Sequence, residues 1–206
     1  NILDKEQPEG VIVQFGGQTA INLAGPLADA GVKILGSSVD SIDRAEDRER
    51  FEQLLTNCNI PRPKGHTVFD TAGALKAAAD VGYPVMVRPS YVLGGRGMEV
   101  VYDPENLRIY MEAAEGVTPD RPILIDRFLR HAMECEADAI SDGEHAYVPA
   151  VMEHIELAGV HSGDSACIIP SRHISEENLK TIKEYTKKIA EEMHVKGLMN
   201  MQYAIE

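Results

Sequence analysis

A glycine-rich turn between two apolar segments is the part of this sequence best suited to chemistry. The segment 88–102 has the sequence RPSYVLGGRGMEVVY, in which three glycines follow Arg88, and we expect residues 83–87 and 98–102 to form strands on either side. Glycine has no Cβ and adopts positive φ readily, so the backbone N–H groups of such a loop can turn toward phosphate oxygens. Arginine adds a permanent charge and a two-pronged donor. The pattern indicates a binding loop for a small phosphate-containing ligand.

A second polar cluster has the sequence GVHSGDSAC, from Gly159 to Cys167. Its backbone and hydroxyl groups are suited to contacting a nucleotide. A solvated hairpin loop would have the same composition, so the residues alone leave both interpretations open.

Three polar residues lie in segments that otherwise resemble strands. Glu134 and Glu136 alternate with Cys135, so both carboxylates point to one face, where they could hold a ribose or a metal. Taken alone, the pair is more typical of a solvent-facing strand. Gln202 lies in an apolar strand, and its amide is either a ligand-facing group or a surface group.

The remaining histidines and the cysteines give weaker signals. Charge pairing with Glu153 and Glu156 explains His154 as well as a catalytic role would. The histidines near the ends of predicted elements are expected at the surface. These are His66, His131, His145, His173 and His194. Cysteines occur at 58, 135 and 167 without a CxxC pair, so the sequence contains no zinc signature, and we expect three structural free thiols.

Composition narrows the classes of partner and compartment. The 206 residues include 20 Lys and Arg against 33 Asp and Glu, for a net charge of −13. Such acidity argues against nucleic acid and anionic membranes as partners. The sequence contains no apolar run of about 18 residues and no signal peptide at its start, and free thiols suit a reducing cytoplasm. Because it lacks an initiator methionine and ends in a strand-like run, we interpret it as a piece of a longer protein.

The first part of the chain predicts a parallel α/β unit. Residues 11–15 and 32–35 are expected to be strands on either side of a helix over residues 19–30. The intervening Gly16 and Gly17 are better explained as a tight turn than as a phosphate loop, because their spacing differs from the dinucleotide fingerprint. Two helices should follow, at 40–44 and 47–57.

The rest of the chain predicts a mixed helix and strand domain. Helices are expected at 71–81, 104–114 and 175–193. Their expected caps are Asp70 or Thr71 for the first, Asp103 for the second and Ser175 for the third. Further strands are expected at 66–69, 123–125, 134–141, 146–155 and 200–206, with a hairpin at Asp142-Gly143.

Several motifs, in order, resemble the large subunit of carbamoyl-phosphate synthase, an ATP-grasp enzyme. They are VQFGGQT (13–19), AEDRERF (45–51), VRPSYVLGGRGMEVVY (87–102), MEHIE (152–156), GVHSGDSAC (159–167) and GLMNMQ (197–202). The resemblance covers nearly the whole chain. It implies the end of a pre-ATP-grasp domain over residues 1–45 and an ATP-grasp fold, truncated at its C-terminal end, over residues 46–206.

The form of the glycine loop resembles the second of the family's two synthetic halves. This implies phosphorylation of carbamate by ATP with Mg²⁺ or Mn²⁺ to give carbamoyl phosphate, for arginine and pyrimidine biosynthesis. It also implies as partners a glutaminase small subunit and the rest of the large subunit.

Residue roles follow from the same resemblance. Arg88 would contact the ATP phosphates under a cover formed by residues 91–97, and Glu134 would bind the ribose hydroxyls. Gln202 would be the first metal ligand. The remaining nucleotide contacts would be Arg127, Leu129, Gly159, Val160, His161 and Ser162, with Arg48 as a further phosphate contact.

The family's other metal ligands, an acidic residue and an asparagine, would follow Glu206, so we expect the isolated chain to be inactive. Two other classes of function stay open. One is another ATP-grasp ligase such as a biotin carboxylase, although Arg88 replaces the lysine usual in that group. The other is a nucleotide-binding module without activity of its own.

Overall fold

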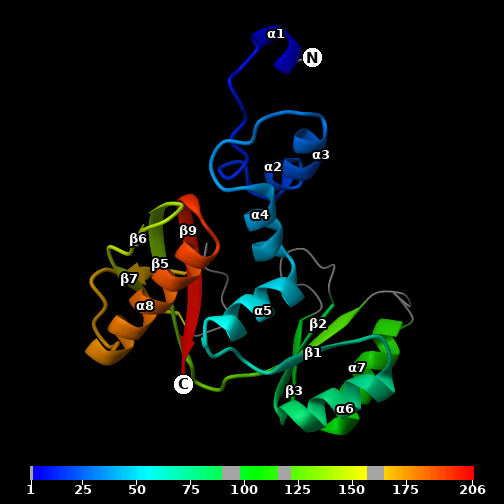
Figure 1. The fold of residues 1–206 in the computed structure, drawn as a ribbon. Helices are drawn as coiled ribbons and strands as arrows, with labels where there is room; N and C mark the ends of the chain where they lie inside the picture. The colour runs from blue at the N-terminus through cyan, green and yellow to red at the C-terminus, as the bar shows by residue number, and fades with distance from the viewer. Residues whose placement is uncertain (1, 90–97, 116–121, 157–164) are drawn as a thin grey trace. The chain divides into compact units, whose positions relative to one another are not determined.

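Two compact units make up the chain, and each has its own sheet and hydrophobic core. The computed structural model in Figure 1 describes residues 2–89, 98–115, 122–156 and 165–206. The first unit combines residues 1–61 with residues 131–206, and the second unit is formed by residues 62–130.

The second unit is a four-stranded antiparallel sheet with two helices along one of its sides (Figure 1). The strands follow the order β1-β4-β2-β3. Its elements are β1 (Gly65–Val68), α6 (Thr71–Val81), β2 (Val85–Pro89), β3 (Glu99–Val101), α7 (Pro104–Glu115) and β4 (Ile123–Arg127).

Alternation along the strands decides which face of this sheet is covered. Val85 and Val87 of β2 are fully buried, whereas Met86 and Arg88 between and after them are only half-buried. The buried side chains join those of the helices in one core, which includes Ala74, Ala78, Leu107, Met111, Ile123 and Ile125. The apolar face is therefore the helix face, and Arg88 lies on the other.

Both helices of this unit begin at the predicted caps. The Asp70 carboxylate accepts a hydrogen bond from Gly73 N–H at 2.6 Å, and Asp103 accepts one from Asn106 N–H at 2.9 Å. Each cap satisfies an N–H group that has no partner within its own helix.

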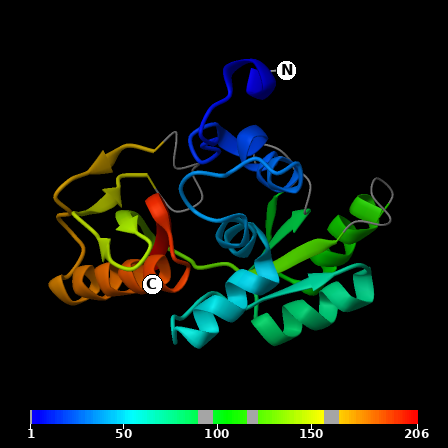
Figure 2. The ribbon, with the colours of Figure 1, turned by 45° about the horizontal axis from the view of Figure 1, so that its top comes forward.

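The first unit contains a five-stranded antiparallel sheet. Strand β5 pairs with β6, β7 and β9, and β7 also pairs with β8. In Figure 2 the long helix α8 (orange) lies along one side of these strands. The elements of the sheet and its helix are β5 (Met133–Asp142), β6 (Ala146–Tyr147), β7 (Val151–His154), β8 (Cys167–Ile168), α8 (Glu176–Glu192) and β9 (Lys196–Ile205). The predicted strand 146–155 is thus two strands, interrupted around Pro149.

Helix α8 covers the face on which Cys135, Ala137 and Ala139 point inward. Ile182 and Ile189 of α8 are buried in the same cluster, as are Leu54 and Leu55 from an earlier helix. Ser175 begins α8 as predicted, because its hydroxyl accepts a hydrogen bond from Asn178 N–H at 3.2 Å.

The start of the chain differs from the predicted parallel unit. It contains short helices and no strand among the described residues: α1 (Ile2–Glu6), α2 (Gly17–Ile21), α3 (Ala24–Asp29), α4 (Val39–Glu46) and α5 (Arg48–Asn57). The two predicted strands meet only at one parallel bridge, between Val11 and Ile34. No described strand flanks this bridge, and a lone parallel pair gains too few hydrogen bonds to form a ladder. Phe15, at the end of the first predicted strand, is 71% exposed.

Two serines fasten this early segment to the end of α8 and the start of β9. The Ser41 hydroxyl donates to the Met193 carbonyl at 2.7 Å, and the Ser37 hydroxyl accepts from Lys196 N–H at 3.0 Å. Gln14 donates to the same Ser37 hydroxyl at 3.2 Å. Gly36, at φ +99°, lies so close that an added Cβ would fall 2.1 Å from the Gln14 side chain.

A buried carboxylate on β7 binds the backbone segment that precedes α8. The Glu153 side chain is 4% exposed and accepts hydrogen bonds from the N–H groups of Arg172 and His173, each at 2.8 Å. Burial raises the pKa of Glu153, but these bonds and the His173 side chain outweigh it and bring the pKa to about 2. Glu153 is therefore a charged structural anchor for the segment before α8.

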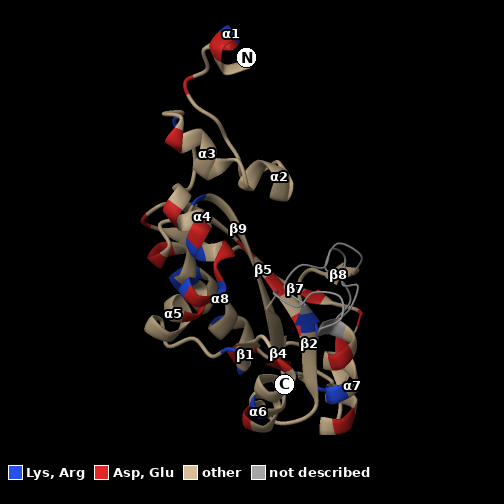
Figure 3. Ribbon diagram, turned by 90° about the vertical axis from the view of Figure 1, so that its right-hand side faces the viewer, with Lys and Arg blue, Asp and Glu red and all other residues tan. Residues whose placement is uncertain are grey.

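Figure 3 marks Asp and Glu (red) and Lys and Arg (blue) along the ribbon of both units. The sequence contains 33 of the former and 20 of the latter. Within the described ranges, no helix has both the length and the apolar character needed to cross a bilayer.

Replacing Leu107 tests the core of the second unit. Leu107 is fully buried on α7, so Leu107→Ala should lower the free energy of unfolding by about 2–5 kcal/mol through lost contacts and a cavity. Ile109 on the same helix is 58% exposed, and Ile109→Ala should change it by less than about 0.5 kcal/mol. Denaturant unfolding curves measure both values. Equal effects of the two substitutions would contradict the assignment of the helix face.

Candidate functional site

The face of the first unit's sheet opposite α8 carries a row of polar side chains. Glu134, Glu136 and Asp138 point to this face because Cys135 and Ala137 between them are fully buried under α8. The prediction that Glu134 and Glu136 share one face is confirmed.

Strand β9 brings Gln202 to the same face. In the ladder between β5 and β9, Gln202 lies directly opposite Glu136, and Ala204 lies opposite Glu134. The small Ala204 leaves Glu134 and Gln202 as diagonal neighbours on adjacent strands, within reach of one ligand. Two of the residues assigned by resemblance are therefore neighbours in the fold, although 68 positions (202 minus 134) separate them in the sequence.

An amide orders two of these carboxylates. The Asn200 side chain donates to Asp138 Oδ1 at 2.9 Å and to Glu136 Oε2 at 3.4 Å. The shorter contact is the better hydrogen bond, so Asn200 is held mainly by Asp138.

His154 belongs to this face and does not pair with Glu153, the first of the two carboxylates expected beside it. Its side chain is 1% exposed, and its Nε2 atom lies 3.8 Å from Glu136 Oε2. Glu153 points to the opposite side of the strand, where it binds the 172–173 backbone. Sequence analysis could not find this neighbour because it depends on the pairing of β5 with β7.

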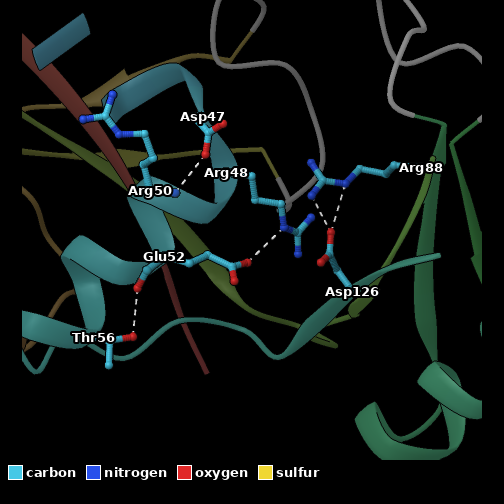
Figure 4. Close-up of polar contacts among 7 residues, drawn as sticks. All are labelled: Asp47, Arg48, Arg50, Glu52, Thr56, Arg88 and Asp126. Atoms are coloured by element: carbon cyan, nitrogen blue, oxygen red, sulfur yellow. Dashed lines mark hydrogen bonds and ion pairs between the residues drawn. The ribbon is translucent and has the colours of Figure 1, made fainter. Parts of the chain in front are cut away.

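Arg88 lies on the uncovered face of the second unit's sheet, and Figure 4 shows its guanidinium against Asp126 of the adjacent strand β4. Both Nε and Nη2 donate to Asp126 Oδ2, the former at 3.1 Å. Arg88 is 42% exposed and Asp126 13%. The carboxylate thus orients the guanidinium while leaving part of it accessible. Asp126 gave no signal of this role in the sequence.

The strand end that follows Asp126 holds the next two predicted contacts. Arg127 donates its backbone N–H to the Lys64 carbonyl at 2.8 Å, and its side chain is exposed. Leu129 follows the strand and is half-buried. Arg48, on α5 of the first unit, pairs with Glu52 at 2.9 Å (Figure 4).

Some predicted site residues lie outside the described part of the chain. They are the loop residues 91–97 and the four nucleotide contacts Gly159, Val160, His161 and Ser162.

Comparison with known proteins decides the family. Residues 47–206 match the family model described as the carbamoyl-phosphate synthase L chain, ATP binding domain, and residues 1–44 match the carbamoyl phosphate synthase preATP-grasp domain. The chain belongs to the carbamoyl-phosphate synthase large-chain family. It is 56% identical over 205 residues to the carbamoyl phosphate synthase large chain of Methanothermobacter thermautotrophicus, and 55% identical over 206 residues to that of Archaeoglobus fulgidus. Each match covers the whole of this chain but only 19% of the length of the relative.

Solved structures agree on the fold of this carbamoyl-phosphate synthase family member. A biotin carboxylase from Campylobacter jejuni, solved as a β,γ-ATP complex, matches with a TM-score of 0.80 and 18% identity, over 99% of this chain and 47% of that one. The D-alanyl-alanine synthetase A of Vibrio cholerae matches with a TM-score of 0.73 and 15% identity, over 95% and 62%. The predicted ATP-grasp fold is confirmed.

The cysteines divide into two classes, in contrast to the expectation of three structural thiols. Cys58 and Cys135 are 4% and 0% exposed, whereas Cys167 is exposed. Burial, with the Glu134 carboxylate, raises the pKa of Cys135 to about 11. Burial and the Glu136 carboxylate also raise the pKa of Cys167.

Thiol labelling checks this division. Under native conditions an aromatic disulfide reagent should modify one thiol per chain rapidly, and all three after unfolding, because only Cys167 is accessible. In Cys167→Ser the rapid phase should disappear. A rapid phase that survives in this variant would contradict the assignment.

Proposed function

We propose that this chain is the nucleotide-binding part of the ATP-grasp unit that phosphorylates carbamate with ATP in a carbamoyl-phosphate synthase large chain. The identity of 55–56% over its full length to two such large chains is the observation that carries the proposal. Under this proposal, residues 1–45 are the end of a pre-ATP-grasp domain, and residues 46–206 belong to the ATP-grasp domain. The partners would be the glutaminase small subunit and the rest of the large chain, in the cytoplasm, in arginine and pyrimidine biosynthesis.

The reaction transfers the γ-phosphoryl group of ATP to a carbamate oxygen, giving carbamoyl phosphate and ADP. Such transfers depend on positioning the in-line oxygens and neutralising charge on the phosphoryl group, rather than on a covalent enzyme intermediate. Arg88 fits this role because its charge is permanent and Asp126 fixes the direction of its planar fork.

On the first unit, Glu134 would accept hydrogen bonds from the ribose hydroxyls. The long ladder between β5 and β9 fixes the backbone of Glu134, so its carboxylate starts from a defined position. Arg127 and Leu129 would present backbone groups to the adenine, and Gly159, Val160, His161 and Ser162 would contact the nucleotide.

Gln202 fits a magnesium ion, because its exposed amide oxygen is a hard ligand on a face that also carries carboxylates. Mg²⁺, or Mn²⁺ in its place, would neutralise phosphate charge there. Gln202 would contribute one of several oxygen ligands.

The first test replaces Arg88 in the whole large chain that contains this sequence. Arg88→Ala should lower carbamoyl phosphate formation from ATP and carbamate by about 100-fold or more, because a charged donor to the transferred group is lost. Arg88→Lys should recover only part of the rate, since the charge returns without the fork. Arg108→Ala is the matched control, because Arg108 is 52% exposed on α7 and pairs with Glu105. Unchanged activity in Arg88→Ala, with an intact fold, would refute the assigned role.

A second test asks whether Glu134 reads the ribose. The wild-type chain should bind ATP about 10-fold or more tightly than 2′,3′-dideoxy-ATP, and Glu134→Gln should abolish that preference, because a hydrogen bond to a charged acceptor is worth about 1.5–3 kcal/mol. Asp138→Asn, four residues along the same strand face, should keep it. Calorimetric titration measures the six affinities, two for each of the three proteins. A preference that persists in Glu134→Gln would remove Glu134 from the site.

These tests also separate the rival functions. A wild-type large chain that prefers ATP over the dideoxy analogue but forms no carbamoyl phosphate would be a nucleotide-binding module. Formation of a carboxylated product in place of carbamoyl phosphate would favour another ATP-grasp ligase.

A further inference from the structure

We propose that Glu136, His154 and Cys167 form a binding site for a thiophilic divalent cation of the Zn²⁺ class. One imidazole, one carboxylate and one thiol converge on the face of the first unit's sheet opposite α8, and their ligand atoms all lie within 4.8 Å of one another. The inference concerns residues to which the proposed function gives no role, and it does not depend on that function.

Strand pairing makes this convergence a property of the fold. His154 of β7 lies directly opposite Cys167 of β8, so their side chains point to the same face. Glu136 reaches that face from the next strand, β5, where it lies opposite Met152, two residues before His154. Three adjacent strands therefore each supply one ligand.

The state of His154 is the second, independent observation. Its side chain is 1% exposed, yet neither ring nitrogen has a hydrogen-bond partner among the described residues. An unsatisfied buried polar group costs about 1–3 kcal/mol, so native structures rarely keep one without a reason. A metal bound at Nε2, the atom that faces Glu136, would supply a partner for one of these two nitrogens.

The distances fit a metal after a small contraction. His154 Nε2 lies 3.8 Å from Glu136 Oε2, and Cys167 Sγ lies 4.0 Å from Glu136 Oε1. Ligand atoms around a tetrahedral zinc ion lie roughly 3.3–3.8 Å apart, given bonds of about 2.0–2.3 Å. Movements of these side chains by about 1 Å would bring the three ligand atoms to that spacing.

Glu136 can turn toward a metal at little cost. Its contact with Asn200 is the longer of the two that Asn200 makes, so that amide stays bonded to Asp138 when Glu136 turns away. Among the described residues, the Cys167 thiol also donates to the Ser165 carbonyl at 3.9 Å, which is a weak interaction.

The ligand set selects the class of metal. Thiolate and imidazole prefer Zn²⁺ and similar ions, whereas Mg²⁺ and Ca²⁺ prefer oxygen ligands only. Three protein ligands leave the fourth tetrahedral position open to water or a ligand, as in exchangeable rather than purely structural zinc sites.

Metal titration of the wild-type chain tests the proposal. Zn²⁺ should bind with one equivalent per chain in competition with a chromophoric chelator, and excess Mg²⁺ should not displace it. Co²⁺ should give a near-ultraviolet thiolate-to-cobalt charge-transfer band. Bound Zn²⁺ should also suppress the rapid labelling of Cys167.

Variants assign the ligands. Cys167→Ser should abolish the cobalt band, and Glu136→Gln and His154→Gln should weaken Zn²⁺ binding at least about tenfold, as expected for loss of one of three ligands. The matched controls keep the site intact: Cys58→Ala for a thiol, Asp138→Asn for a carboxylate on the same strand face, and His145→Gln for an exposed imidazole.

The proposal fails if the wild-type chain binds no stoichiometric Zn²⁺, or if Cys167→Ser binds Zn²⁺ and Co²⁺ as the wild type does. Cys167 is exposed, so Cys167→Ser keeps the fold and remains informative even where His154→Gln unfolds. Thermal unfolding of the metal-free variants identifies that case.

Discussion

The pairing of β5 with β9 is the constraint on which the first unit depends. Ten residue pairs join the two strands, from Met133 opposite Ile205 to Asp142 opposite Lys196. Side chains alternate between two unlike faces, one packed on α8 and the other polar. A slip of one residue would turn Glu134 and Glu136 into the core and expose Cys135. The cost of burying those carboxylates fixes the register, and the register in turn fixes which polar groups become neighbours.

Strand alternation also determines the two faces of the second unit's sheet, where the polar face carries an arginine and its partner carboxylate. Its helices bury Val85 and Val87, which leaves Arg88 on the open face beside Asp126. A partly exposed ion pair contributes about 0–1 kcal/mol to stability, so this pair is better understood as an orienting contact than as a structural one. Arg88 can therefore change partner at small cost when a stronger anion such as a phosphate is present.

Sequence patterns predicted the features that depend on local residues. The caps Asp70, Asp103 and Ser175, and the shared face of Glu134 and Glu136, follow from short-range hydrogen bonding and strand alternation. The prediction of two parallel strands at the start was wrong, because apolar segments form strands only where neighbouring strands complete the ladder.

Long-range partners escaped prediction for a related reason. Asp126 lies 38 residues from Arg88, and Cys167 lies 31 residues from Glu136, so no spacing rule connects them. The sequence contains no CxxC pair and so no zinc signature. The ligands of the proposed zinc site come from three separate strands, which only the strand pairing brings together. Resemblance supplied the roles of Glu134 and Gln202, because composition alone favoured an ordinary solvent-facing strand for Glu134.

Fold similarity alone does not choose among chemistries here. Proteins named as a biotin carboxylase and a D-alanyl-alanine synthetase share this fold at 15–18% identity, so the backbone is common to different ligases. The chemistry of this chain therefore has to come from the set of side chains on the sheet faces opposite its helices. On the first unit that set contains oxygen donors such as Glu134 and Gln202, and nitrogen and sulfur donors from His154 and Cys167. Hard cations favour the first group and soft cations the second, with Glu136 able to serve either. If both proposed sites bind their ions, one sheet face would discriminate between two kinds of cation by donor chemistry alone, without a change of backbone.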